Sequence, residues 1–261
     1  MLAPMISLER DGALAVATLA RPPVNAINGE WLARLEAVTA ESSGAAVLLI
    51  RSSQKAFCAG ADLELMRGRF ESAEGRALMV GLAREMQRVF ARLERLPQVT
   101  IAEIGGAAMG GGLELALACD LRIAAEDARL GLPEVRLGLL PGAGGTQRLP
   151  RVAGEAAARR LILGAEVVTG TVAARLNIVQ WAVPAAELAA RARAIAAEIA
   201  ALPAAALAEA KACIGDPRGY ERELEATARL LARDETRARV RAFLEKRPAS
   251  AAAGPRFRAR S

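Results

Sequence analysis

Two glutamates, Glu114 and Glu134, have the residue type and the surroundings for acid–base chemistry. Glu114 follows a glycine-rich run at 109–113, where glycines leave the backbone N–H groups unshielded by side chains. Glu134 lies in the Gly/Pro-punctuated segment 131–135, and a second glycine-rich turn follows at 141–145. Paired carboxylates beside bare amides can polarise a carbonyl group while moving protons near it. The pattern therefore indicates chemistry on an activated acyl group.

Each glutamate also has an ordinary structural interpretation. The positive end of a helix dipole favours a carboxylate in the first turn, which would explain Glu114 without catalysis. Glu134 would then be a solvated loop carboxylate. The catalytic interpretation depends on the pattern around both residues.

The composition is that of a packed globular protein. The chain has 261 residues, of which 53% are hydrophobic and 25% charged, enough for one large domain or for one domain with a smaller appendage. No stretch approaches the roughly 20 apolar residues of a membrane span. Residues 1–7 lack the basic region and long apolar core of a signal peptide. We therefore expect a cytoplasmic protein.

The chain contains no histidine, and its three cysteines are Cys58, Cys119 and Cys213. Their number and spacing fit neither a metal site nor a disulfide framework. Without histidine, a Cys–His or Ser–His nucleophile is impossible and the commonest metal ligand is missing. We interpret the cysteines as small apolar residues and expect no metal or redox cofactor.

The net charge of +6 suggests a polyanionic partner, either nucleic acid or a small molecule that carries phosphates. Aromatic residues make up only 3%, which leaves few platforms for stacking nucleic acid bases. The arginines of the helical stretch 218–244 alternate with acidic residues, a pattern typical of an ion-paired, solvated helix face. Nucleic acid binding is therefore the less favoured alternative, and an affinity that falls steeply with salt would support it.

Hydrophobic patterning predicts alternating strands and helices up to about Pro184. The predicted strands are 14–19, 45–50, 99–104 and 121–125, and the predicted helices are 29–40, 75–96 and 112–120. Alternation of this kind indicates an α/β architecture with largely parallel strands. Beyond Pro184 only helical patterns remain, at 185–201, 203–213 and 218–244. Residues 249–261 have no periodicity and are expected to form a mobile tail.

Five segments together resemble the enoyl-CoA hydratase/isomerase (crotonase) superfamily in identity, order and spacing. They are KAFCAGADL (55–63), GGAAMGGGLELA (105–116), CDLRIA (119–124), GLPEV (131–135) and LGLLPGAGGTQRL (137–149). An early RPPVNA (21–26) and a late AFLEKR (242–247) extend the likeness over nearly the whole chain.

The resemblance implies an α/β fold, a crotonase-like spiral of ββα units with a C-terminal α-helical trimerisation region. Residues 1–200 would form the spiral core with the acyl-CoA site, and residues 201–261 the helical region and tail. Such proteins assemble as homotrimers or as hexamers made of two trimers.

The resemblance also implies which residues bind an acyl-CoA thioester. The backbone N–H groups of Ala61 and Gly111 would form an oxyanion hole. The substrate-binding residues would be Lys55, Ala59, Gly60, Ala61, Asp62, Leu63, Gly111, Gly142 and Lys246. Lys55, and Lys246 of a neighbouring subunit, are candidates for contacts to the nucleotide phosphates. The side chain of Asp62 also suits the N-cap of the helix that follows it.

Glutamates at both positions favour a 2-enoyl-CoA hydratase of the fatty acid β-oxidation type. Glu114 would activate the water that attacks Cβ, and Glu134 would exchange the proton at Cα. Coenzyme A would be part of the substrate, and no other cofactor is implied. The enzymatic alternatives are a Δ3–Δ2 enoyl-CoA isomerase that uses Glu134, and a hydratase of a branched substrate such as 3-methylglutaconyl-CoA.

Among the departures from the family pattern are a turn near residue 177 and the segment 64–81. Asn177-Ile178-Val179 stands where a Gly-Leu-Val is usual, which puts the local turn in doubt. The segment 64–81 is the least family-like, and we expect it to determine the acyl chain length.

Overall fold

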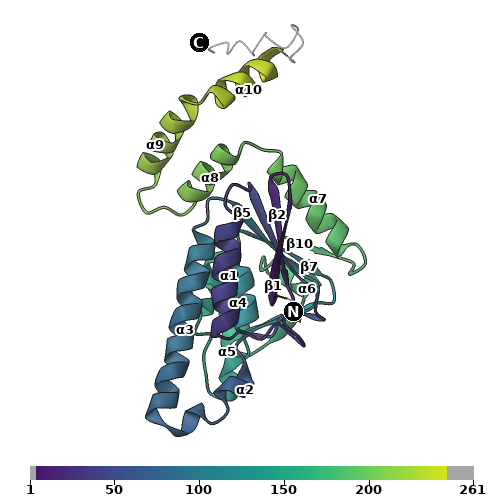
Figure 1. Ribbon diagram of the computed structural model, residues 1–261, viewed down its shortest axis with the longest axis vertical. Helices are drawn as coiled ribbons and strands as arrows, with labels where there is room; N and C mark the ends of the chain where they lie inside the picture. Colours follow the sequence, from purple (N-terminus) through teal and green to yellow (C-terminus); the bar gives the residue numbers. More distant parts are fainter. Residues whose placement is uncertain (1–3, 246–261) are drawn as a thin grey trace, which may run out of the picture. The chain divides into compact units, whose positions relative to one another are not determined.

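The computed structural model describes residues 4–245, in which strands and helices alternate (Figure 1). The strands are β1 (Ile6–Asp11), β2 (Leu14–Leu19), β3 (Val47–Ser52), β4 (Ala56–Cys58), β5 (Val99–Ile104), β6 (Ala107–Met109), β7 (Leu121–Ala125), β8 (Arg129–Gly131), β9 (Val167–Thr169) and β10 (Trp181–Val183). The α-helices are α1 (Gly29–Glu41), α2 (Leu63–Met66), α3 (Ala73–Glu94), α4 (Gly111–Leu117), α5 (Gly145–Leu163), α6 (Gly170–Arg175), α7 (Leu188–Ala200), α8 (Ala204–Cys213), α9 (Tyr220–Leu231) and α10 (Asp234–Glu245). Two 3₁₀ turns, η1 (Arg69–Glu71) and η2 (Glu134–Leu137), complete the described chain.

The strands form two sheets. The larger has the order β1-β2-β3-β5-β7-β10, and all of its pairs are parallel except the β1–β2 hairpin. The smaller has the order β4-β6-β8-β9, with β9 antiparallel to β8. The α/β architecture with largely parallel strands is therefore confirmed.

A strand–strand–helix unit repeats along the chain. β3, β5 and β7 are neighbours in the large sheet, and each is followed directly by a strand of the small sheet, β4, β6 or β8. The chain then enters α3, α4 or α5, reached through α2 and η1 in the first unit and through η2 in the third. The repeat is the spiral of ββα units that the resemblance implied.

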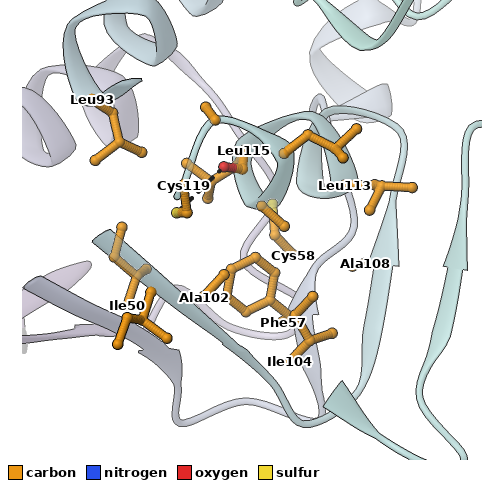
Figure 2. Close-up of a cluster of buried hydrophobic side chains, with 14 of the residues drawn as sticks. Ile50, Phe57, Cys58, Leu93, Ala102, Ile104, Ala108, Leu113, Leu115 and Cys119 are labelled. Carbon is orange, nitrogen blue, oxygen red and sulfur yellow. Dashed lines mark hydrogen bonds between the residues drawn. The ribbon is translucent and has the colours of Figure 1, made fainter. Parts of the chain in front are cut away.

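The hydrophobic core lies between the large sheet and the helices of these units. Every residue of α4 is buried. Figure 2 shows Leu113 and Leu115 of α4 with Phe57 of β4 and Ile104 of β5. Helix α7 packs against the large sheet on the strands β2, β3, β5 and β7 (Figure 1). A core that surrounds α4 holds its N-terminus in a fixed position relative to both sheets.

The chain divides into two compact units, one up to Leu207 and one from Ala208 onward. The predicted division after residue 200 stays a prediction. In the second unit, the arginines of α9 are paired with acidic residues: Arg229 with Glu209 at 2.6 Å, and Arg222 with Glu209 at 3.4 Å. On α10, Arg237 and Arg239 pair with Asp234 and Glu235. The prediction of an ion-paired helix face is confirmed for these residues.

Several elements differ from their prediction. The stretch 218–244 is two helices, because α9 ends at Leu231 and α10 starts at Asp234. Strand β1 and the three-residue strands were not predicted. The turn at Asn177 forms with a φ of 60°, a left-handed conformation that asparagine tolerates better than other residues with a side chain. Among residues 4–245, no helix is long and apolar enough to cross a membrane.

Candidate active site

The two predicted oxyanion segments follow neighbouring parallel strands of the small sheet. Ala59, Gly60 and Ala61 come after β4, and Gly111 comes after β6. Gly60 has a φ of 90°, and a Cβ at this position would lie 2.8 Å from the Met109 carbonyl oxygen and 3.0 Å from the Gly111 nitrogen. The two segments therefore approach each other so closely that position 60 must be glycine.

The amides of Ala61 and Gly111 are left without partners by the local backbone pattern. Ile27 N donates to Gly60 O at 2.8 Å, and Asp62 N donates to Ile27 O at 3.0 Å. This bridge uses the groups on either side of the Ala61 amide, which faces away from Ile27. Gly111 is the first residue of α4, so its N–H has no acceptor within the helix. Within residues 4–245, neither N–H donates a hydrogen bond.

Glu114 lies in the first turn of α4 and is only 2% exposed. One of its carboxylate oxygens, Oε1, accepts hydrogen bonds from the N–H groups of Ala143 and Gly145, both at 2.7 Å. Burial raises the pKa of Glu114 above its usual value, and these two hydrogen bonds and the charge of Arg148 partly offset the rise. The donors come from the second glycine-rich turn, so the structure brings the two predicted motifs together.

Side chains of α3 and α5 hold that turn in place. Arg148 is buried, and its Nη1 donates to the Ala143 carbonyl oxygen at 3.0 Å. Its Nε and Nη2 both donate to Glu94 of α3, at 3.1 and 3.0 Å. Gln87, also on α3, donates to the Gly142 carbonyl oxygen at 2.6 Å. The amides that bind Glu114 are therefore fixed by contacts from two helices.

Glu134 is the first residue of η2, and its carboxylate has a different environment. Its Oε2 is buried and has no hydrogen-bond partner among the described residues. Its Oε1 lies next to Gly110, where a Cβ would come within 2.9 Å of it. Burial raises the pKa of Glu134 to about 7, and the nearby Glu114 carboxylate adds to the rise. The side chain therefore holds a proton more tightly than an ordinary glutamate.

Both glutamates line one cavity of about 660 Å³. Of the predicted site residues, Ala59, Gly60, Ala61, Leu63, Gly111 and Gly142 also line it. The rest of the wall is mainly apolar and comes from α3, from the segment 137–140 and from β9. These apolar residues include Met79, Val80, Leu82, Ala83, Met86, Leu137, Leu139, Leu140 and Val167.

Two of the predicted substrate-binding residues that the structure describes do not line the cavity. Lys55 is exposed in the turn between β3 and β4. Asp62 is the N-cap of α2, as predicted, and accepts from Glu64 N at 3.2 Å. It also pairs with Arg21 at 2.8 Å, and this hydrogen bond lowers the pKa of Asp62. Lys246 lies outside the described residues.

The interpretation of Cys58 and Cys119 as apolar core residues is confirmed. Both are buried in the core (Figure 2), and burial raises the pKa of the Cys58 thiol to about 12. The Cys58 carbonyl lies 2.0 Å from the position of a Cβ at residue 112, which must therefore be glycine. The thiol contributes packing rather than a nucleophile.

Sequence reasoning missed Arg148, Glu94 and the α3 wall of the cavity. The sequence could have predicted that one face of α3 is apolar, because four cavity residues recur at helical spacing: Met79, Leu82, Ala83 and Met86. Arg148 and Glu94 are 54 positions apart, and nothing in the sequence links them.

The chain belongs to the enoyl-CoA hydratase/isomerase family, whose model matches residues 9–251. A probable enoyl-CoA hydratase of Bacillus subtilis is 38% identical over 252 residues, which cover 93% of this chain and 96% of that protein. A crotonyl-CoA hydratase of Syntrophomonas wolfei is 37% identical over 258 residues, covering 94% and 96%.

The fold agrees with this assignment. The crystal structure of an enoyl-CoA hydratase from Bacillus anthracis is similar with a TM-score of 0.87 and 32% identity, over 94% of this chain and 97% of that one. The predicted crotonase-like fold is therefore confirmed.

Proposed function

We propose that this protein adds water across the double bond of a 2-enoyl-CoA thioester to give a 3-hydroxyacyl-CoA. One observation carries the proposal: two glutamates of one cavity lie in different hydrogen-bonding environments, beside two amides that have no partner within residues 4–245. Hydration needs this combination, because one group must accept a proton from water while another delivers a proton to carbon.

We base the assignment of the protons on the difference between the two environments. The Glu114 carboxylate accepts two backbone hydrogen bonds, which favour its ionised form. The Glu134 carboxylate accepts a backbone hydrogen bond only from its own residue, and its Oε2 has no partner among residues 4–245. Its pKa of about 7 leaves it largely protonated in slightly acidic solution. Glu114 is therefore the base and Glu134 the acid in the hydration direction.

Water then adds to the double bond of the thioester in the following steps. The thioester oxygen binds to the N–H groups of Ala61 and Gly111. Glu114 takes a proton from water as the water oxygen bonds to Cβ, and the π electrons move toward the thioester, where the two amides stabilise the enolate oxygen. Glu134 gives its proton to Cα. The pair ends with the proton on Glu114 and returns to its starting state by proton exchange.

The acyl chain would lie along the apolar wall that α3 and the segment 137–140 provide. Lys55, and Lys246 of a neighbouring subunit, remain candidates for the coenzyme A phosphates. The reaction as written moves protons only, so it uses no cofactor beyond the coenzyme A of the substrate. We place the protein in the cytoplasm, in fatty acid β-oxidation, as a homotrimer or hexamer.

The first test is incubation with crotonyl-CoA, following the loss of ultraviolet absorbance of the conjugated thioester and identifying the product. We expect 3-hydroxybutyryl-CoA. Glu114→Gln should lower the hydration rate by roughly 100- to 10,000-fold, since it removes the base but keeps the side-chain size. Thioester binding, measured by calorimetry, should survive. Near-normal hydration by this variant would refute the role of Glu114.

Glu134 also supports the isomerase alternative, because a carboxyl group with a pKa of about 7 can move a proton between two carbons of the acyl chain. Incubation of Glu114→Gln with 3-hexenoyl-CoA separates the two functions. A primary isomerase would convert this substrate to the 2-enoyl thioester at the wild-type rate, whereas a hydratase that depends on both glutamates would not.

A further inference from the structure

The motif RPPVNA (21–26) takes no part in the hydration steps, yet it lies beside the residues that carry the Ala61 amide. Val24 O accepts a hydrogen bond from Ala59 N at 3.0 Å. Just after the motif, Ile27 exchanges two hydrogen bonds with the chain on either side of Ala61, at 2.8 and 3.0 Å. These bonds set the place of the peptide group whose N–H would bind the thioester oxygen.

Ile27 also lies beside the second oxyanion residue. Its Cδ1 is 3.4 Å from the position that a Cβ at Gly111 would take. The Ile27 side chain is fully buried, so the surrounding core holds it in one orientation. A shift of this short segment would therefore disturb the surroundings of both amides.

The side chain of Asn25 anchors the segment from the inside, and it is completely buried. Its Oδ1 accepts from Arg21 N at 2.8 Å, and its Nδ2 donates to Ser52 Oγ at 2.8 Å. Nδ2 also donates to the carbonyl oxygens of Phe57 and Ala56, at 3.0 and 3.3 Å. The amide oxygen thus closes the turn of the motif, and the amide nitrogen joins the motif to β3 and β4.

The backbone of Asn25 adopts a left-handed conformation with a φ of 55°. Its N donates to Arg21 O at 2.8 Å, and its O accepts from the Cys58 thiol at 3.0 Å. Asparagine tolerates this conformation better than most residues with a side chain, but glycine tolerates it better still. The backbone alone therefore does not require asparagine, whereas the buried hydrogen bonds do.

We infer that Asn25 is a positioning residue that aims the Ala61 amide at the thioester oxygen. Asn25 does not line the cavity, so it acts through the hydrogen bonds of its segment. The inference rests on the proposed hydration reaction, in which the amide stabilises charge that develops in the transition state. A misplaced donor of this kind lowers turnover more than substrate binding.

Asn25→Gly removes the side chain and still permits the backbone conformation. We expect kcat for crotonyl-CoA hydration to fall roughly 10- to 100-fold, the cost of misplacing a group at the reacting centre, with little change in KM. Ser52→Ala removes one partner of the same amide and should lower kcat by roughly 2- to 10-fold. It tests the same anchor if a melting temperature shows that Asn25→Gly does not fold.

Asn177→Gly is the matched control, because Asn177 is an exposed asparagine with a similar φ of 60°. It lies between α6 and β10 and does not line the cavity. This variant should keep the wild-type kcat and KM. A comparable loss of kcat in Asn177→Gly would overturn the inference, since the effect would then not be specific to the position beside Ala61.

Infrared spectroscopy of bound butyryl-CoA, isotopically labelled at the thioester carbonyl, separates positioning from folding. This thioester has no double bond to hydrate, and hydrogen bonds to its carbonyl oxygen lower the stretching frequency. Binding to the wild-type protein should lower the frequency, and binding to Asn25→Gly should lower it less. A reduced kcat with the wild-type frequency would overturn the inference and leave Asn25 a structural residue only.

The inference and the proposed function can fail separately. A wild-type protein that lowers the carbonyl frequency of butyryl-CoA but hydrates no enoyl thioester would refute the proposed function, and the frequency in Asn25→Gly would still test the positioning of the amide. Hydration by the wild type with unchanged kcat in both Asn25→Gly and Ser52→Ala would refute only the inference.

Discussion

At the scale of single residues, Glu114 and Glu134 are the same amino acid with different chemical properties. Burial raises the pKa of both, but Glu114 accepts backbone hydrogen bonds from two residues of a distant turn, whereas Glu134 accepts one only from its own residue. The sequence predicted the pair and its glycine-rich surroundings. It could not assign the proton, because the donors to Glu114 lie 29 and 31 positions away along the chain.

The proton assignment predicts a specific pH dependence. Hydration needs Glu114 ionised and Glu134 protonated, whereas dehydration needs the reverse, so both directions require the pair to hold one proton. The pKa of Glu134 is raised to about 7, and the proton is lost as the pH rises through that value. We therefore expect kcat/KM for crotonyl-CoA hydration and for 3-hydroxybutyryl-CoA dehydration to fall together, about tenfold per pH unit above this point.

Stopped-flow rates between pH 5 and pH 9 would measure the pH profile of kcat/KM in each direction, with an acidic limb where Glu114 becomes protonated and a basic limb where Glu134 loses its proton. Because water addition consumes no net proton, the two profiles must be parallel. A rate that stays flat up to pH 9 would contradict the assignment of the acid to Glu134.

At the scale of elements, α3 connects the acyl cavity to the catalytic base. One part of the helix lines the cavity with Met79, Ala83 and Met86. Further along, Gln87 and Glu94 hold the turn whose amides bind Glu114, the latter through Arg148. The position of the base therefore depends on the same helix that the acyl chain contacts.

Breaking this connection should affect turnover more than binding. Arg148→Met removes the hydrogen bond to Ala143 O and a positive charge that lowers the pKa of Glu114. We expect kcat for hydration to fall roughly 10- to 100-fold, the cost of misplacing a catalytic group, with little change in KM. The acidic limb of the pH profile should move to higher pH, because Glu114 then holds its proton more tightly.

Arg151→Met is the control, since Arg151 lies on the same helix, is exposed and only approaches Glu94 at 4.0 Å. Arg148→Lys keeps the positive charge, so its acidic limb should move to higher pH by less than that of Arg148→Met. A melting temperature measured for each variant identifies any loss of folding. An unchanged pH profile with reduced kcat would assign Arg148 a purely structural role.

The elements that sequence patterns predicted are those with long apolar periodicity. β2, β5 and β7 match their predictions residue for residue, and α1 and α3 match within two residues at each end. The strands of the small sheet have three residues each, too few to show alternation in the sequence. The break between α9 and α10 falls at Ala232 and Arg233, where no glycine or proline marks it.

At the scale of the whole molecule, the second compact unit exposes large apolar side chains. Within the described part of α9 and α10, they are Tyr220, Leu224, Leu231, Val240, Phe243 and Leu244. Leu231, Val240 and Leu244 line a groove of about 370 Å³ between these two helices. Exposed apolar surface of this extent is typical of a protein–protein contact. It supports the proposed assembly into a trimer or hexamer.

Charged substitutions in the groove test this proposal. Leu231→Glu combined with Val240→Glu should shift the mass measured by light scattering from the oligomer to smaller species, because each carboxylate would lose its hydration in a contact. Ala238→Glu adds one carboxylate to α10 outside the groove and should leave the mass unchanged. A wild-type protein that is a monomer at micromolar concentration would contradict the proposed assembly.

The two N–H groups that follow β4 and β6 and have no partner within residues 4–245 belong to the main chain, and one of them is on a residue that is already alanine. A scan that replaces each residue by alanine in turn would pass over Ala61 and would leave the peptide nitrogen of Gly111 in place. Deleting either donor would require replacing a peptide bond by an ester during chemical synthesis. The contribution of these groups to the rate is therefore invisible to ordinary mutagenesis and can be measured only by changing the backbone.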